Sequence, residues 1–98
     1  MLMIEIRKTE VFAKWIDELQ DIRARARILV RIERLSAENP GDVKSVGEGV
    51  SEMRIDYGPG YRVYYKQQGR KVLIFLAGGD KKSQAKDIKT ALGLARNL

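Results

Sequence analysis

The clearest pattern in the chain is an alternation of apolar and polar side chains over Met53–Tyr65, interrupted once at Gly58-Pro59-Gly60. Alternation of this kind is typical of a strand whose two faces meet different surroundings, and a glycine–proline–glycine run is typical of a turn. The segment therefore predicts a β-hairpin. If its strands pair symmetrically about Pro59, the polar positions meet as Glu52 opposite Lys66, Arg54 opposite Tyr64, and Asp56 opposite Arg62.

The two faces of this hairpin differ in chemistry. One face is apolar and carries Met53, Ile55, Tyr57, Tyr61, Val63 and Tyr65. The opposite face is polar and holds two arginines, Arg54 and Arg62. Because folding removes apolar surface from water, we expect the first face to cover a core and the second face to carry the function.

Two successive segments before the hairpin have the residue spacing of amphipathic helices. Thr9 is a suitable N-cap for the first helix and Asp21 for the second, which we expect to reach about Glu38 before the stop signal at Asn39-Pro40-Gly41. A weak alternation over residues 1–7 predicts a short strand ahead of both helices. The apolar side of the second helix is predicted to be Ile22, Ala26, Ile28, Leu29, Ile32 and Leu35.

The remaining segments complete the predicted fold. Residues 41–49 contain several glycines and predict a loop, whereas residues 71–78 are almost continuously apolar, as in a strand covered on both faces. Asp80 is the expected N-cap of a final helix, whose buried side is predicted to be Ala85, Ile88, Leu92 and Ala95.

The resulting order, β-α-α-β-β-β-α, predicts an α+β fold. We expect a mainly antiparallel, twisted sheet with an N-terminal helical hairpin and a C-terminal helix packed against it. A chain of 98 residues is long enough for one hydrophobic core, so residues 1–98 are expected to form a single domain.

The composition narrows the chemistry that the chain can perform. It contains no cysteine and no histidine, which excludes a disulfide framework and removes the commonest metal ligand and acid–base residue. We therefore expect no metal and no cofactor, and any catalysis must use Lys, Arg, Tyr, Asp, Glu or Ser. The net charge of +6 favours a polyanionic or acidic partner, although a merely soluble basic protein is the plainer alternative.

The sequence also carries signals about location. The longest apolar run, Val72–Ala77, is far too short to span a bilayer, and Met1–Glu5 shows no basic segment ahead of an apolar one. We expect no membrane span and no secretory signal, and hence a cytoplasmic protein.

Arginines recur along the second predicted helix at Arg23, Arg27, Arg31 and Arg34, which places them in one row. Together with Lys66 of the hairpin, these are the candidate RNA-binding residues, because such a row can contact phosphates. The alternative interpretation is a solvated face of long side chains, which is the commoner role of such rows.

A candidate catalytic site combines the hairpin arginines Arg54 and Arg62 with Lys81 and Lys82, which follow the last strand beside a helix N-terminus. Arginine forks can hold the non-bridging oxygens of a phosphodiester and offset the charge of its transition state. For RNA the nucleophile can be the substrate's own 2′-hydroxyl, with a lysine or Tyr64 moving protons. Alternatively, the charged hairpin residues form ordinary cross-strand pairs on a wet surface.

The stretches Met53–Tyr65, Gly78–Gln84 and Asp87-Ile88 together resemble the RelE/ParE toxin superfamily, and within it the HigB-like addiction module killer proteins. The resemblance covers almost the whole chain and implies a toxin of a type II toxin–antitoxin pair. It further implies a small cognate antitoxin, typically with a helix-turn-helix domain that binds the operator DNA. Well-studied RelE-like members cleave mRNA in the ribosomal A site with arginine and lysine side chains, which inhibits translation and arrests growth.

The resemblance also assigns roles to residues. Arg62 matches a catalytic arginine of RelE-type toxins, Arg54 falls near a basic residue on the preceding strand, and Lys81 or Lys82 replaces an arginine after the last strand. Glu52 stands where RelE itself has a lysine, and the final helix has no tyrosine near Asp87-Ile88. Tyr64 or a lysine is therefore the candidate proton-transfer group.

Three functions are compatible with these features. The favoured one is a ribosome-dependent mRNA endonuclease that is independent of metal. The second is inhibition of DNA gyrase, as in ParE-type relatives, and the third is a basic RNA-binding module without enzymatic activity. Fold alone does not separate them.

Overall fold

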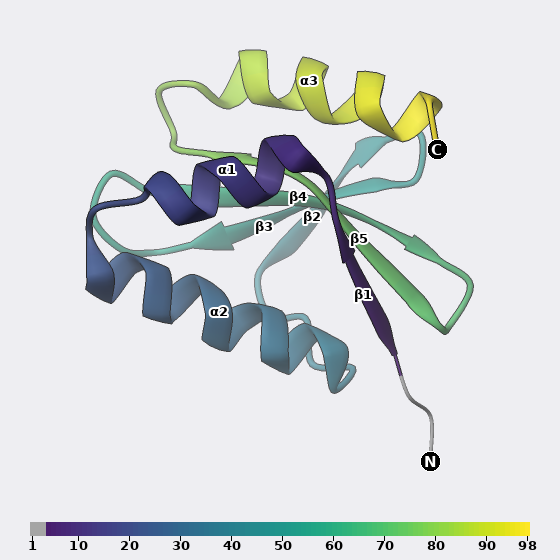
Figure 1. Ribbon diagram of the computed structural model, residues 1–98, viewed down its shortest axis with the longest axis horizontal. Coiled ribbons are helices and arrows are strands. Elements are labelled where there is room, and N and C mark those ends of the chain that lie inside the picture. Colours follow the sequence, from purple (N-terminus) through teal and green to yellow (C-terminus); the bar gives the residue numbers. More distant parts are fainter. Residues whose placement is uncertain (1–3) are drawn as a thin grey trace.

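A computed structural model describes residues 4–98, which form one five-stranded sheet with helices packed on both faces (Figure 1). The elements are β1 (Glu5–Lys8), α1 (Glu10–Glu18), α2 (Ile22–Ser36), β2 (Val43–Gly47), β3 (Val50–Ile55), β4 (Tyr61–Gln68), β5 (Val72–Gly79) and α3 (Gln84–Arg96). The predicted first strand is present from Glu5, and its first three positions lie outside the described residues. In the described part of the chain, none of the helices is long and apolar enough to cross a membrane.

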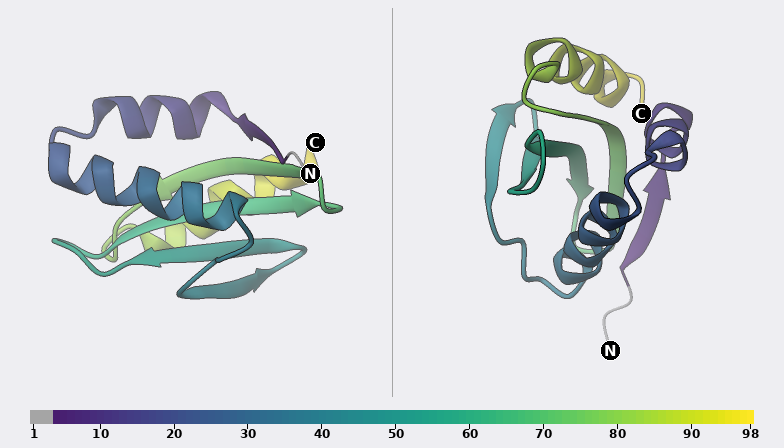
Figure 2. Two further views of the ribbon diagram at one scale, coloured as in Figure 1. Left: turned by 90° about the horizontal axis from the view of Figure 1, so that it is seen from below. Right: turned by 90° about the vertical axis from the view of Figure 1, so that its left-hand side faces the viewer.

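The strands lie in the order β1-β5-β4-β3-β2. β1 pairs with β5 in parallel, and the other neighbours pair antiparallel. The predicted α+β class and mainly antiparallel sheet are therefore confirmed. Figure 2 shows α1 and α2 together on one side of the sheet and α3 on the other.

Each face of the sheet has its own hydrophobic core. Under α1 and α2, Phe12 and Ile28 pack with Phe75 of β5 and with the apolar face of the hairpin. Under α3, Ala91 packs with Leu76 of β5 and with other residues of the inner strands. Because alternate residues of β5 enter the two cores, this strand is covered on both sides, as its continuous apolar sequence predicts.

The loop prediction for residues 41–49 is wrong in its central part, which forms β2. This strand pairs with β3 through a tight turn at Glu48-Gly49, where both residues have positive φ. Two-residue hairpin turns of this kind require positive φ at both central positions, which glycine supplies without steric cost. The glycines in this segment therefore mark a hairpin, and the two hairpins share β3.

The predicted register of the central hairpin is also wrong, by two residues. Arg54 pairs with Arg62 and Glu52 with Tyr64, because the connection between β3 and β4 extends over residues 56–60. The turn is closed by the Gly60 N–H, which donates to the Tyr57 carbonyl over 3.1 Å, and is not centred on Pro59. A shift of two residues keeps every side chain on its predicted face, so Met53, Ile55, Val63 and Tyr65 are buried as expected.

The predicted apolar side of α2 is correct for Ile28, Ile32 and Leu35 and wrong for the other three residues. Ile22 is 78% exposed, Leu29 is 50% exposed, and Ala26 is exposed too, whereas Ala24 is buried. Two rows of this helix have helical spacing, one through Ala24, Ile28 and Ile32 and one through Ile22, Ala26 and Leu29. Periodicity alone could not decide which row meets the sheet.

The predicted cap of the last helix is one turn too early. The helix begins at Gln84 with Ser83 at the N-cap position. Asp80 instead accepts hydrogen bonds from the backbone N–H groups of Lys82 and Ser83, over 2.9 and 3.1 Å, and so closes the turn before the helix. On the predicted buried side, Ala95 is buried and Ile88 and Leu92 are partly buried, but Ala85 is exposed.

Two glycines at the end of β5 allow close contacts from both sides. A Cβ atom at Gly78 would overlap the Trp15 ring of α1, and a Cβ atom at Gly79 would overlap an Asp87 carboxylate oxygen of α3. No side chain fits at either position without displacing a neighbour. These contacts hold the strand end that leads to Lys81.

We predict that Gly78→Ala lowers the free energy of unfolding by about 1–3 kcal/mol, because overpacking forces side chains and backbone to shift. Gly93→Ala is the matched control, since that helical glycine has no heavy atom within 4 Å of a built Cβ. The control should raise the free energy of unfolding by about 0.5–1 kcal/mol, as alanine is the better helix former. Urea unfolding followed by circular dichroism measures both, and equal stability of the two variants would contradict the packing argument.

Candidate functional site

Cationic side chains gather in one pocket at the end of the central hairpin. Arg54 of β3, Arg62 of β4 and Lys81 line it, together with Asp42, Ile55, Asp56, Gly60 and Tyr61. Arg62 pairs with Gly79 across β4 and β5, so the segment that carries Lys81 leaves the sheet beside this arginine. The structure thus brings together three of the four predicted catalytic cations. Lys82 is exposed and, among the described residues, is not part of the lining.

Arg54 is fixed at both its backbone and its side chain. Its N–H donates to the Asp42 carbonyl over 3.0 Å, and its carbonyl accepts a short hydrogen bond from Nη1 of Arg31. Its Nε donates to Oε1 of Glu52 over 3.0 Å, while the side chain is 37% exposed. One end of the guanidinium is therefore anchored and the other end reaches solvent.

Arg62 is held more deeply, with a side chain that is only 12% exposed. Its Nη1 donates to the Gly60 carbonyl over 2.8 Å. Its Nε lies 3.7 Å from Oε2 of Glu52 and makes no hydrogen bond with the described residues. The two arginines therefore approach the same carboxylate, one on each of its oxygens.

Glu52 is the buried acid at the centre of this arrangement, and its side chain is 1% exposed. Besides Arg54, it accepts hydrogen bonds from Tyr64 Oη and Gln84 Nε2, each over 2.9 Å. Burial alone would raise the pKa of Glu52, but the hydrogen bonds from Gln84, Arg54 and Tyr64 outweigh it, and the pKa is lowered. The carboxylate is charged at neutral pH.

The role of Glu52 is not evident in the sequence, because the predicted register pairs it with Lys66 on the polar face of the hairpin, whereas it pairs with Tyr64. α3 covers that part of the hairpin, as the burial of Glu52 and Tyr64 shows. Gln84, which opens α3 and contacts the carboxylate directly, carried no signal in the sequence beyond its place in the first helical turn.

Tyr64 and Lys66 lie apart from the pocket. Tyr64 is fully buried and donates its hydroxyl to Glu52, and burial together with this hydrogen bond raises the pKa of the phenol well above its ordinary value. Lys66 pairs with Val50 at the other end of β3, where its side chain lies beside Gly49. The tyrosine in the pocket is Tyr61, whose pKa is raised mainly by burial.

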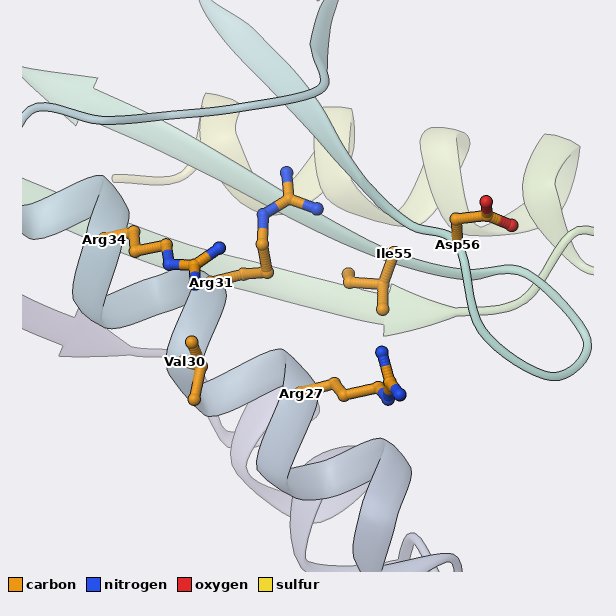
Figure 3. Close-up of a pocket in the computed structure, with 6 residues that line it drawn as sticks. All are labelled: Arg27, Val30, Arg31, Arg34, Ile55 and Asp56. Carbon is orange, nitrogen blue, oxygen red and sulfur yellow. The ribbon is translucent and has the colours of Figure 1, made fainter.

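The arginine row of α2 lines a second pocket that adjoins the first (Figure 3). Arg27, Val30, Arg31 and Arg34 face Ile55 and Asp56, and the last two residues also line the first pocket. The Arg27 guanidinium lies over the Tyr57 ring at 4.6 Å from its centroid. Arg23 is exposed and, in the described chain, outside both linings.

Arg31 has a structural role that its place in the row did not indicate. Besides the Arg54 carbonyl, its guanidinium donates to the carbonyls of Pro40 and Asp42, over 3.1 and 3.3 Å. It therefore ties α2 to β3 and to the segment before β2. Arg27 and Arg34 are the members of the second pocket whose guanidinium groups are exposed for an anionic ligand.

The chemistry of this surface suits a phosphate-rich ligand. Guanidinium and ammonium groups converge at the first pocket, and further guanidinium groups continue along the second. No group of three or more His, Cys, Asp or Glu residues within residues 4–98 is arranged to hold a metal ion.

Comparison with known proteins places the chain in a family. The model of the family Phage derived protein Gp49-like (DUF891) matches residues 14–98. The chain belongs to this family. A protein of Haemophilus influenzae with the name "Uncharacterized protein" is 50% identical over 97 residues, which cover 99% of this chain and 98% of the relative.

Among solved structures, a mutant of the E. coli toxin RelE in the free state matches with a TM-score of 0.72 at 18% sequence identity. The match covers 94% of this chain and 97% of the RelE chain. The RelE-like fold is thereby confirmed. Membership of the HigB-like branch stays a prediction, as do the roles of the individual site residues.

We predict that Glu52 makes stability depend on pH in the acid range. Because its pKa is lowered from the ordinary value of 4.5, the charged carboxylate stabilises the fold above that pH, and this contribution is lost as pH falls through the folded-state pKa. The free energy of unfolding of the wild type should therefore drop more steeply than that of Glu52→Gln between about pH 5 and pH 3.

Urea unfolding at a series of pH values measures this difference. Glu33→Gln, at an exposed position of α2, is the matched control and should follow the wild-type curve. If the free energies of unfolding of the wild type and of Glu52→Gln differ by the same amount at every pH, the buried contacts of Glu52 do not lower its pKa.

Proposed function

We propose that the protein is the toxin of a type II toxin–antitoxin module, a HigB-like member of the RelE/ParE superfamily that cleaves mRNA on translating ribosomes. The observation that carries this proposal is the convergence of Arg54, Arg62 and Lys81 on one pocket of a RelE-like fold. The membership of the Gp49-like family and the fold of a named toxin support the toxin role. RNA supplies its own nucleophile, so this reaction suits a chain without histidine or cysteine.

In the proposed reaction, Arg54 and Arg62 bind the non-bridging oxygens of the scissile phosphate. The ribose 2′-oxygen attacks the adjacent phosphorus, the bond to the 5′-oxygen breaks, and a 2′,3′-cyclic phosphate and a free 5′-hydroxyl result. The arginines stabilise the additional charge on the phosphorus oxygens in the transition state. Lys81 donates a proton to the departing 5′-oxygen, and Lys82 adds positive potential at the rim.

The proton of the 2′-hydroxyl requires an acceptor in the pocket. Burial raises the pKa of Tyr61, which keeps its hydroxyl protonated at neutral pH, whereas Asp56 is an exposed carboxyl in the same lining. We assign Asp56 as the acceptor. Tyr64, which is fully buried, acts in this proposal through its hydrogen bond to Glu52 and not as a proton carrier.

The arginine row extends the proposed binding surface. Because the two pockets share Ile55 and Asp56, an RNA strand bound at Arg54 and Arg62 can continue along Arg27 and Arg34. Phosphate contacts of this kind add affinity without sequence preference, so they serve to hold the strand in register.

For this activity we predict that Arg62→Ala and Arg54→Ala each lower cleavage by about 10²-fold or more, since each removes a donor to the transition state. Arg70→Ala is the control, because Arg70 is an exposed arginine in the turn between β4 and β5. The measurement is growth after induction, together with mapping of mRNA 5′ ends on translating ribosomes.

The same experiment decides among the three functions. Growth arrest with codon-phased cleavage supports the nuclease. Growth arrest in which the mRNA stays intact and the DNA is broken would replace the nuclease proposal by gyrase inhibition. If expression of the wild type does not slow growth, the remaining function is a basic RNA-binding module without enzymatic activity.

We further propose that the partner is a small antitoxin, of the helix-turn-helix type, that connects the complex to its operator DNA. One of its segments covers the outer face of α2 and the basic pockets beside it. On α2, Ile22, Leu29 and Val30 are 78%, 50% and 44% exposed. Exposed apolar side chains next to Arg27 and Arg34 favour a segment that carries both apolar and acidic side chains.

We predict that Leu29→Glu and the double substitution Arg27→Glu, Arg34→Glu each weaken antitoxin binding by about tenfold or more, because each places negative charge against an acidic partner. Lys89→Glu reverses one charge at an exposed position of α3, on the opposite face of the sheet, and serves as the control. Titration calorimetry with the product of the adjacent small reading frame measures the affinity. Unchanged binding after these substitutions would exclude the α2 face as the contact.

A further inference from the structure

We propose that Glu52 is a positioning residue of the site, whose buried carboxylate orients the guanidinium groups of Arg54 and Arg62 before any substrate binds. This inference rests on the proposed nuclease function for its catalytic consequence. The placement of the arginines by Glu52 is a separate physical statement and can be tested without cleavage.

The geometry assigns one carboxylate oxygen to each arginine. Arg54 Nε donates to Oε1 over 3.0 Å, and Arg62 Nε lies 3.7 Å from Oε2. Both arginines therefore turn the Nε edge of the guanidinium inward. Both side chains line the same pocket, and Nη1 of Arg62 donates to the Gly60 carbonyl. The Arg54 guanidinium is hydrogen-bonded at Nε, and the Arg62 guanidinium is hydrogen-bonded at Nη1 with its Nε beside the carboxylate. Each has therefore lost rotational freedom, so its remaining donors are directed.

The electrostatics of the hairpin require such a group. Arg54 and Arg62 occupy directly opposed positions of β3 and β4, and like charges at opposed positions destabilise a sheet. A buried carboxylate between them attracts both and allows them to stay close. Because one negative charge meets two positive charges, Glu52 and the two arginines together keep one net positive charge, and the pocket that the arginines line also holds Lys81, Asp42 and Asp56.

The carboxylate is itself held by groups from two other directions. Tyr64 of β4 and Gln84 of α3 each donate to Oε2 over 2.9 Å. Rotation of Glu52 away from the arginines would leave the buried Tyr64 hydroxyl and the partly buried Gln84 amide without this acceptor, which is costly. The first residue of α3 thus contributes to the orientation of side chains that it does not contact directly.

The first test uses NMR of the arginine Nε–Hε groups and needs no enzymatic activity. In Glu52→Gln, the Hε signals of Arg54 and Arg62 should shift and exchange faster with solvent than in the wild type. Glu48→Gln is the matched control, because Glu48 accepts from the Nε of exposed Arg96 over 2.9 Å. It should move the Arg96 signal and leave those of Arg54 and Arg62 in place.

The second test measures cleavage on ribosomes. Misplacement of a catalytic group by about 1 Å can cost about 10²-fold in rate. We therefore expect Glu52→Gln to lower kcat by about 10²-fold with KM changed by less than about threefold. Glu52→Asp keeps the charge and should recover part of the lost kcat, whereas Glu48→Gln should cleave like the wild type.

The outcomes are separable. Unchanged Hε signals of both arginines in Glu52→Gln, or kcat within about twofold of the wild type, would overturn the positioning role. If Glu52→Gln does not fold, wild-type exchange decides, because an Arg54 Hε that exchanges as fast as that of exposed Arg70 would equally overturn it. If the wild type cleaves no mRNA, the nuclease proposal fails, while the NMR comparison still decides whether Glu52 orients the arginines.

Discussion

The structure depends on one buried charge. Glu52 lies beneath α3 with its carboxylate ionised, and a buried charge is tolerated only where partners replace the water that it has lost. Those partners come from β3, β4 and α3, so the contact joins the hairpin to the last helix. The same carboxylate allows two arginines to occupy opposed positions in adjacent strands. Stability and the candidate site are therefore linked through a single side chain.

Sequence patterns predicted the fold well where the spacing of apolar residues was compatible with only one arrangement. The alternation over the hairpin determined which side chains enter the core, and the caps at Thr9 and Asp21 marked the helix starts. The patterns failed where two solutions satisfied the same rule. A two-residue shift of register leaves both faces unchanged, and α2 carries two apolar rows of equal spacing. The choice between such solutions lies in turn hydrogen bonds and in packing between distant elements, which a local pattern does not contain.

The candidate site was predictable only in outline. Arg54, Arg62 and Lys81 could be grouped because hairpin geometry and the end of β5 bring them to one edge. Arg31 and Tyr64 could not be sorted in advance. Their polar ends are satisfied inside the molecule, by backbone carbonyls and by Glu52 respectively. Whether a polar side chain faces a ligand or a buried partner depends on the elements that pack beside it, which are α3 for Tyr64 and the segment before β2 for Arg31.

The glycines at the end of β5 have a consequence for how the surface meets its ligand. Trp15 and Asp87 lie close against the backbone of the strand end from opposite faces, so the segment that leads to Lys81 starts from a closely packed position. An ammonium group on such a rigid support loses less conformational entropy on complex formation than one on a mobile loop. The pocket is therefore expected to be largely preformed. The close packing beside it depends on the absence of a Cβ atom at Gly78 and at Gly79.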